Sequence, residues 1–202
     1  FMKVFYNYEI TGKENLPTKA KSGKFIYTAN HVSIFDPPMV SMAAMRPIAY
    51  MAKKELFVDS EKLSWLVKRL GAFAVDRTKP EIATFKTVRD ILATSWSLGV
   101  FPQGGIRPYG KLDEVKKGFV VIAKNAKADI VPVGIEGFDG YPKLKPFTRR
   151  NVKLHIGKPI SYQLPEDEII YQWGEQISKL AGYENCLPVP ASRQSVKETV
   201  NT

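Results

Sequence analysis

The chain has 202 residues, 44% hydrophobic and 25% charged, a balance that indicates one globular domain and argues against a disordered segment. Thirty Lys and Arg against twenty Asp and Glu give a net charge of +10, so we expect an anionic partner: a phosphate-bearing substrate, an anionic membrane surface or nucleic acid. The single cysteine, Cys186, cannot form an internal disulfide and suits a reducing compartment. Two histidines and one cysteine, far apart in the sequence, lack the spacing of a metal site.

Short β-type runs alternate with helical runs along the chain. This alternation predicts an α/β fold, with a mostly parallel central sheet flanked by helices in a single domain. The predicted strands are 2–10, 25–29, 48–52, 73–75, 99–101, 130–134 and 152–156. The predicted helices are 37–45, 61–70, 80–98, 114–126 and 166–181. We expect the domain to cover residues 1–182 and a flexible tail, with prolines and small polar residues, to cover 183–202.

Neither a secretory signal nor a membrane span is predicted. The most apolar candidate, residues 25–45, is interrupted by Asn30, His31, Asp36 and a proline pair, whereas a span needs about 20 mainly apolar residues. The sequence therefore predicts a protein that is soluble or that sits on a membrane surface.

A histidine and an aspartate five residues later follow the strand predicted at 25–29, in the segment NHVSIFDP. Histidine can take a proton from a hydroxyl near neutral pH because its free pKa is about 6.5, and a nearby carboxylate fixes its tautomer and stabilises the imidazolium. Pro37 suits the first position of a helix, which makes Asp36 the expected N-cap, with its carboxylate within reach of His31. The alternative is a histidine that only hydrogen-bonds inside a turn.

The helix predicted over 80–98 has a proline at its first position and Gly99 just past its end. Its apolar residues recur at helical spacing, and we assign them to the core. They are Ile82, Phe85, Val88, Leu92 and Trp96.

Three further blocks follow the histidine segment in order: GAFAVDR at 71–77, FPQGGIR at 101–107 and IVPVGI at 130–135. With the connecting AKKEL and KG segments, the four blocks resemble the motif blocks of the glycerolipid acyltransferases, in particular the 1-acylglycerol-3-phosphate (lysophosphatidate) acyltransferases. The resemblance runs from Tyr8 to Ile160. It implies transfer of an acyl chain from an acyl thioester to the free hydroxyl of 1-acylglycerol-3-phosphate, which gives phosphatidate.

The resemblance also implies a mechanism. The first motif's histidine is the family's general base for direct attack of the acceptor hydroxyl on the thioester, so this role falls to His31, with Asp36 orienting it. Direct attack needs no acyl-enzyme, and the sequence has no Gly-x-Ser-x-Gly elbow, while Cys186 lies in the expected tail. We expect no bound cofactor and no metal. The acyl donor is acyl-CoA or acyl-acyl carrier protein, and both stay open, as does acyl carrier protein as a partner.

Substrate-binding roles follow from the same resemblance. Arg77 is expected to hold the acceptor's phosphate, because a guanidinium matches phosphate oxygens in pairs; the alternative is a surface ion pair with Asp76. Lys53 aligns with a lysine frequent in relatives and is expected to be a second phosphate contact, or else a solvated charge. Pro132 and Val133 are expected to line the acyl or acceptor pocket, or else to belong to a core strand.

The third block departs from the family's usual Phe-Pro-Glu-Gly-Thr-Arg-Ser, because Gln103 replaces the acid and one extra residue precedes Arg107. We expect Gln103 to hydrogen-bond an acceptor hydroxyl, and we count Arg107 among the substrate-binding residues. Gly104 and Gly105 lack Cβ and could let backbone N–H groups approach an oxyanion or a phosphate; the alternative is a tight turn. The departure leaves open a different lysolipid or glycerol-phosphate acceptor.

Two other features concern the surface. His155 alternates with apolar neighbours and is predicted to lie on the polar face of its strand, beside Lys153. The stretch 56–73 combines apolar residues at helical spacing with Trp65 and basic side chains, which is typical of a helix in a membrane interface but also of an ordinary amphipathic helix packed on a sheet.

We therefore expect a peripheral enzyme on the cytoplasmic face of an anionic membrane. A rival from another class is a non-catalytic basic protein that binds lipid or nucleic acid. The intact His31 and Asp36 argue against lost activity, and the dispersed lysines, without a nucleic-acid motif, argue against nucleic acid.

Overall fold

The structure of the protein, a computed structural model, describes residues 6–17, 24–75, 82–137 and 150–193. A seven-stranded sheet has the order β1-β8-β7-β2-β5-β3-β4, and its neighbouring strands are parallel except for the antiparallel pair of β7 and β8. Its strands are β1 (Tyr6–Thr11), β2 (Lys24–Ala29), β3 (Ile48–Lys53), β4 (Ala72–Val75), β5 (Ser97–Val100), β7 (Ala128–Glu136) and β8 (Arg150–Ile156). The predicted α/β fold with a mostly parallel sheet is confirmed.

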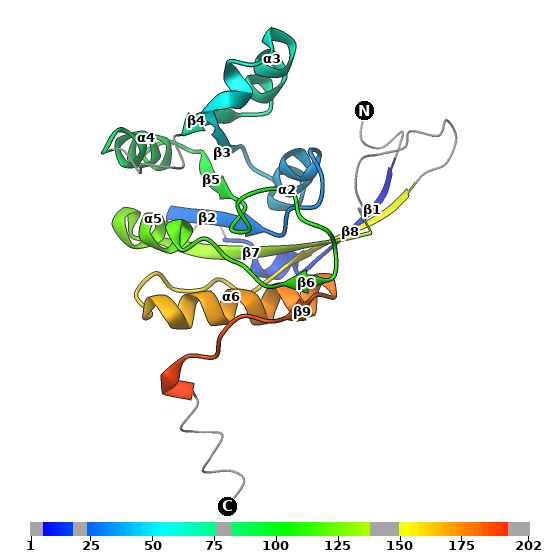
Figure 1. Ribbon diagram of the computed structural model, residues 1–202, viewed down its shortest axis with the longest axis vertical. Coiled ribbons are helices and arrows are strands. Elements are labelled where there is room, and N and C mark those ends of the chain that lie inside the picture. Colours follow the sequence, from blue (N-terminus) through cyan, green and yellow to red (C-terminus); the bar gives the residue numbers. More distant parts are fainter. Residues whose placement is uncertain (1–5, 18–23, 76–81, 138–149, 194–202) are drawn as a thin grey trace, which may run out of the picture.

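Helices flank this sheet, and a second sheet of two strands lies at its side (Figure 1). The helices are α2 (Asp36–Ala44), α3 (Glu61–Arg69), α4 (Ile82–Leu92), α5 (Gly118–Ala126) and α6 (Glu166–Ala181), with the short 3₁₀ turns η1 (Lys13–Asn15) and η2 (Lys54–Phe57). The small sheet pairs β6 (Lys111–Leu112) with β9 (Glu184–Asn185). Figure 1 shows α3 beyond the β4 edge of the large sheet, at the opposite end of the fold from α6.

The core lies around β2 and β7, whose residues are almost all buried, as expected for strands covered on both faces. The indole N–H of Trp173 on α6 donates to the hydroxyl of Thr28 on β2 at 2.8 Å, so the largest buried side chain is also satisfied. Gly99 on β5 lies opposite Tyr50 on β3, and an added Cβ would stand 2.3 Å from the Tyr50 ring. The absence of a side chain at Gly99 therefore makes room for Tyr50, which reaches the functional site.

The prediction of one helix over 80–98 is wrong at its C-terminal end, since α4 ends at Leu92. The hydroxyl of Thr94 donates to the Ile91 carbonyl and accepts from the Trp96 N–H, which closes the turn after the helix. The next residues, Ser97–Val100, pair with both β2 and β3 as a central strand. Trp96 is 43% exposed rather than in the core, and Gly99 is a strand residue rather than a helix stop.

The packed structure extends beyond the boundary predicted at residue 182. Tyr183 and Leu187 are buried, and β9 pairs with β6 through hydrogen bonds that include Cys186 N–H to the Leu112 carbonyl. Gly174 on α6 lies against Leu187, so the helix surface accepts this side chain. The expected flexible tail therefore does not begin at residue 183; residues 194–202 lie outside the described part of the chain.

Within the described residues, no helix has both the length and the apolar composition that crossing a membrane requires.

Candidate active site

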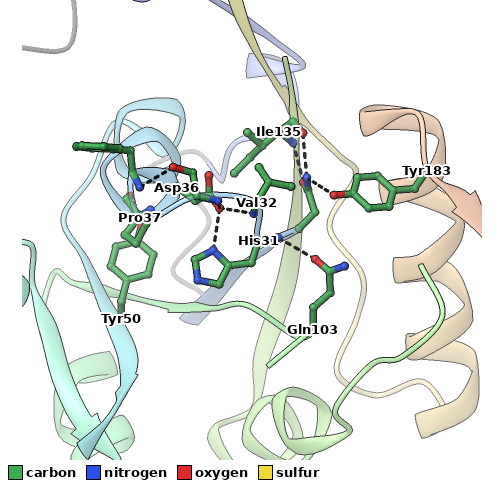
Figure 2. Close-up of polar contacts among 11 residues, drawn as sticks. His31, Val32, Asp36, Pro37, Tyr50, Gln103, Ile135 and Tyr183 are labelled. Atoms are coloured by element: carbon green, nitrogen blue, oxygen red, sulfur yellow. Dashed lines mark hydrogen bonds and ion pairs between the residues drawn. The ribbon is translucent and has the colours of Figure 1, made fainter. Parts of the chain in front are cut away.

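His31 and Asp36 meet in the loop that follows β2, at the edge of the sheet where its parallel strands end (Figure 2). The His31 Nδ1 lies 2.7 Å from the Asp36 Oδ2, and the two side chains are 17% and 0% exposed. This places a partly accessible imidazole against a fully buried carboxylate. The contact that the sequence predicted between these two side chains is present, and it fits both a catalytic base and a histidine that only hydrogen-bonds inside a turn.

Asp36 is not the N-cap that the sequence predicted. It is the first residue of α2, the N-cap is Phe35, and no side chain caps the helix. The Asp36 Oδ2 instead accepts from the backbone N–H groups of Val32 at 2.7 Å and Ser33 at 2.8 Å. These two hydrogen bonds hold the residues after His31 against the Asp36 carboxylate, and the His31 Nδ1 contacts the same oxygen, Oδ2.

Two opposing effects act on the Asp36 carboxyl. Burial raises its pKa above the ordinary value, while hydrogen bonds from His31, Ser33 and Val32 oppose that rise. Because Oδ2 receives three donors, the carboxylate is held in one orientation, and it can keep Nδ1 of His31 protonated.

The third sequence block lies against the same histidine. The Gln103 Oε1 accepts from the backbone N–H of His31 at 2.8 Å, and the Arg107 backbone N–H donates to the His31 carbonyl at 2.8 Å. The Phe101 ring stacks on the imidazole with centroids 4.1 Å apart. Gln103 is 2% exposed and its oxygen is engaged by the His31 N–H, so the contact with an acceptor hydroxyl expected from the sequence could be made only by its amide N–H groups.

The two glycines of this block differ in their surroundings. Gly104 has a φ of 75° and its N–H donates to the Phe101 carbonyl at 3.0 Å, which is the tight turn named as the alternative. A Cβ added at Gly105 would meet nothing within 4 Å, so open space adjoins that residue.

The Arg107 side chain forms an ion pair at the surface. Its guanidinium contacts Glu114 at 3.1 Å, and both side chains are about half exposed. Lys116 also pairs with Glu114, and the hydrogen bond and charge of Lys116 lower the pKa of that carboxyl. The structure therefore gives the Arg107 side chain an ion pair at the surface, and its role in substrate binding stays a prediction.

Of the two residues predicted to bind phosphate, the structure describes Lys53. Lys53 is the last residue of β3, is exposed, and pairs in register with Val75, the last residue of β4. Arg77 lies outside the described residues, so its role stays a prediction.

An apolar cavity of about 430 Å³ lies next to His31, because Phe101 lines the cavity and its ring also stacks on the imidazole. The cavity lies among the ends of β3, β4 and β5 and the helices α4 and α5. Its lining is Met51, Val75, Thr84, Phe85, Val100, Phe101, Pro102, Gly104, Lys116, Lys117, Gly118, Phe119, Val121 and Ile122. The exposed lysines among them, Lys116 and Lys117, directly precede the first residue of α5.

Pro132 and Val133 do not line this cavity. Both are buried in the middle of β7, where Val133 pairs with Ala29 and the Pro132 carbonyl accepts from Gly157. Both residues thus lie in a core strand, as the alternative predicted, and a pocket role for them stays a prediction.

Sequence reasoning missed two residues that support the site. Asn30, 0% exposed, donates to the Ile135 carbonyl at 2.9 Å and accepts from the Ile135 N–H at 2.8 Å, which fixes the start of the histidine loop on β7. Tyr50 donates to the Pro37 carbonyl at 2.7 Å and stacks on Phe101. Asn30 could have been found from the sequence, because a polar residue that directly follows a buried apolar strand needs a hydrogen-bond partner inside the protein.

His155 lies on the face of β8 that the alternation predicted but is only 18% exposed in its side chain. Its Nδ1 contacts the Thr11 hydroxyl at 2.7 Å and its Nε2 lies 3.3 Å from Glu136. Across the described residues, no three His, Cys, Asp or Glu gather as metal ligands would.

Comparison with known proteins finds similar sequences and a similar structure over most of this chain. A family model described as "Acyltransferase" matches residues 7–136. The 1-acyl-sn-glycerol-3-phosphate acyltransferase of Bacillus subtilis (strain 168) is 33% identical over 153 residues, 75% of this chain and 73% of that protein. The enzyme of the same name from Streptococcus pneumoniae is 34% identical over 139 residues, 67% of this chain and 50% of that protein. The crystal structure of PlsC, the 1-acyl-sn-glycerophosphate (LPA) acyltransferase from Thermotoga maritima, has a TM-score of 0.66 at 26% identity and covers 88% of this chain and 72% of that one.

Proposed function

Because this chain belongs to the acyltransferase family, we propose that it transfers an acyl chain from an acyl thioester to the free hydroxyl of 1-acylglycerol-3-phosphate and so forms phosphatidate. The observation that carries the proposal is the 2.7 Å contact of His31 with a buried carboxylate beside an apolar cavity. The acceptor is taken from relatives whose printed names specify it.

His31 is the general base in this proposal. With Nδ1–H donating to Asp36, the ring nitrogen Nε2 is left as an acceptor, and no described residue hydrogen-bonds it. Nε2 takes the proton of the acceptor hydroxyl while that oxygen attacks the thioester carbonyl. As the C–O bond forms and the C–S bond breaks, the proton passes from the imidazolium to the leaving thiolate. Asp36 stabilises the imidazolium between these two steps.

The apolar cavity is the proposed binding site of the acyl chain. Burial of each methylene contributes about 0.8 kcal/mol, so a lining of Met51, Phe85, Val100 and similar side chains would hold a chain whose carbonyl lies near His31. In acyl-CoA and in acyl-acyl carrier protein alike, the thioester stands at one end of a pantetheine arm and a phosphate at its other end. Lys116 and Lys117, at the start of α5, suit either donor.

For the acceptor's phosphate we propose Lys53 and Arg77. Lys53 is exposed where β3 ends, at the edge of the sheet that also bears His31. The net charge of +10 and the exposed Trp65 on α3 support work at the surface of an anionic membrane, on its cytoplasmic face.

A second candidate is the same reaction with another lysolipid or with glycerol phosphate as acceptor. It is favoured by the third block, in which one extra residue before Arg107 departs from the usual family pattern.

One assay tests both candidates. Purified protein is given acyl-CoA or acyl-acyl carrier protein together with 1-acylglycerol-3-phosphate, other lysophospholipids or glycerol-3-phosphate, and the acylated product is measured. We expect the highest kcat/KM with 1-acylglycerol-3-phosphate. A higher value with another acceptor would establish the second candidate, and no transfer from either donor would leave the rival, a non-catalytic binding protein.

A further inference from the structure

We propose that Gln103 is a positioning residue: its amide oxygen fixes the peptide of His31 and so aims the imidazole, and it does not bind the acceptor. This inference rests on the proposed role of His31 as general base. It assigns to the glutamine a function opposite to the one expected from its sequence block, because its oxygen is already engaged 2.8 Å from the His31 N–H.

Four contacts hold His31, and three of them come from residues 101–107. The Gln103 Oε1 and the Arg107 N–H each lie 2.8 Å from the backbone of His31, one on its N–H and the other on its carbonyl. Phe101 covers one face of the ring with an interplanar angle of 20°. The Asp36 carboxylate provides only the contact to Nδ1. Figure 2 shows Gln103 reaching the His31 backbone from the side opposite Asp36.

Loss of the glutamine oxygen has a specific physical consequence. Gln103 is 2% exposed, so the His31 N–H would be left without its buried acceptor. The peptide could then rotate to find water, and the ring would move with it. A displacement of about 1 Å in a reacting group can lower the rate by up to about 100-fold, even when binding is unchanged.

A neutral amide also suits this place better than an acid would. The Asp36 carboxylate is completely buried on the other side of His31, and burial already disfavours its charged form. A second buried carboxylate would add like-charge repulsion and a further loss of hydration. Gln103 gives the same hydrogen bond to the His31 N–H without a charge.

The test compares two variants at this position with a matched control. Gln103→Met removes the acceptor at similar length, and Gln103→Glu keeps an acceptor oxygen. Gln176→Met is the control. Gln176 lies on α6, which bears no proposed site residue, and its Oε1 likewise accepts from a backbone N–H, that of Lys158 at 2.7 Å. Each protein is assayed at its own pH optimum, so that a shifted pKa does not change the comparison.

We expect Gln103→Met to lower kcat by roughly 10-fold or more while the KM values of donor and acceptor stay within about twofold. Burial and repulsion from Asp36 favour the protonated form of a carboxyl at this place, so Gln103→Glu still offers a neutral acceptor oxygen and should recover most of kcat, and Gln176→Met should keep it. A raised acceptor KM with unchanged kcat in Gln103→Met would show that Gln103 binds the acceptor and would overturn the proposal. An equal loss of kcat in Gln103→Glu or in Gln176→Met would also overturn it. If Gln103→Met does not fold, Gln103→Asn, whose shorter side chain leaves room for water, takes its place.

A second measurement separates this inference from the proposed reaction. The Nδ1 proton of His31, held by Asp36, can be followed by NMR without any substrate. We expect its signal to broaden or vanish through faster exchange in Gln103→Met and to persist in Gln103→Glu and Gln176→Met. An unchanged signal in Gln103→Met overturns the positioning role even if acyl transfer is confirmed. A changed signal supports it even if the acceptor proves to be a different one.

Discussion

Every group around His31 restricts it in a different way, and Nε2 is the ring nitrogen left for chemistry. Asp36 fixes the tautomer, Phe101 covers one face of the ring, and the backbone is held at both ends of the residue. A base that is already oriented does not have to be ordered as the reaction begins. The general-base hypothesis therefore makes a direct prediction for the side chain itself.

His31→Ala should lower kcat by at least roughly 100-fold, the scale of general-base catalysis. The side chain is only in part buried, at 17% exposure, so the variant should fold, as thermal unfolding will check. Near-normal activity, or a covalent acyl-enzyme trapped with thioester alone, would contradict direct attack.

Asp36 gives a prediction for how the free energy of unfolding depends on pH. Burial raises the pKa of this carboxyl in the folded protein, so the group favours folding below its unfolded pKa of about 3.9 and loses that contribution as the pH rises through the folded value. Asn does not titrate. Relative to Asp36→Asn, the wild type should therefore lose free energy of unfolding as the pH rises from about 4 towards neutrality.

Urea unfolding of both proteins at a series of pH values measures this difference. A wild type that gains stability over Asp36→Asn with rising pH would show that the three hydrogen bonds outweigh burial. In the same variant kcat should fall, by less than in His31→Ala, since the imidazole remains.

Arg77 carries the prediction for the acceptor. Loss of a fork-type contact with phosphate should cost about 1.5–3 kcal/mol, seen mainly as a higher acceptor KM in Arg77→Ala, with partial recovery in Arg77→Lys. The comparison is with an acceptor that lacks the phosphate. Equal losses on both acceptors would point to structural damage and not to a phosphate contact.

Secondary structure elements could be predicted wherever the local pattern matches the final environment. Strands β2, β3, β4, β7 and β8 and helix α6 lie close to their predicted ranges. The end of α4 could not be found in this way, because Ser97–Val100 takes its strand conformation from pairing with β2 and β3. The apolar residues recur at helical spacing as far as Trp96, and this local pattern does not reveal that the next residues pair with β2 and β3, which are distant in the sequence.

Contacts between elements explain the other differences. The approach of Gln103 to His31 joins residues 72 positions apart, and the contact of Asn30 with Ile135 joins residues 105 apart. The motifs identified the right neighbourhood, since parallel strands end at one edge. They did not show that the Gln103 side chain contacts the backbone of His31.

Helices α4 and α5 provide a test of the cavity. Val121 on α5 lines it and is 38% exposed, so Val121→Trp should fill space without a change in the core. Excluding about two methylenes of a long acyl chain costs about 1.6 kcal/mol, which corresponds to roughly a 10-fold lower kcat/KM for a long-chain donor. A short-chain donor is the internal control and should be little affected. Equal losses on both donors would place the acyl chain elsewhere.

At the scale of the whole molecule, charge and exposed apolar side chains suggest how a lipid acceptor is reached. The chain carries a net charge of +10, and α3 lies at the far end of the fold (Figure 1). Trp65 on this helix is 60% exposed with the Arg69 guanidinium 5.0 Å from its ring, and Val58 before it is 75% exposed. An aromatic side chain among basic ones is typical of a surface that enters the interface of an anionic bilayer.

Replacement of Trp65 and Val58 by Ser should therefore weaken binding to anionic vesicles and lower activity on vesicle-borne acceptor, while activity on a short-chain, water-soluble acceptor persists. Both side chains are exposed, so the core should be unaffected. Each Lys or Arg near the membrane contributes about 1 kcal/mol, and this part of the binding should decline as salt shortens the Debye length. The matched control is Met45→Ser, which also removes an exposed apolar side chain, at 74% exposure. Met45 precedes the first residue of β3 and Val58 follows the last one, so the two residues lie at opposite ends of this strand. Co-sedimentation equal to that of the wild type, or an equal loss in Met45→Ser, would show that the protein meets the membrane through another surface.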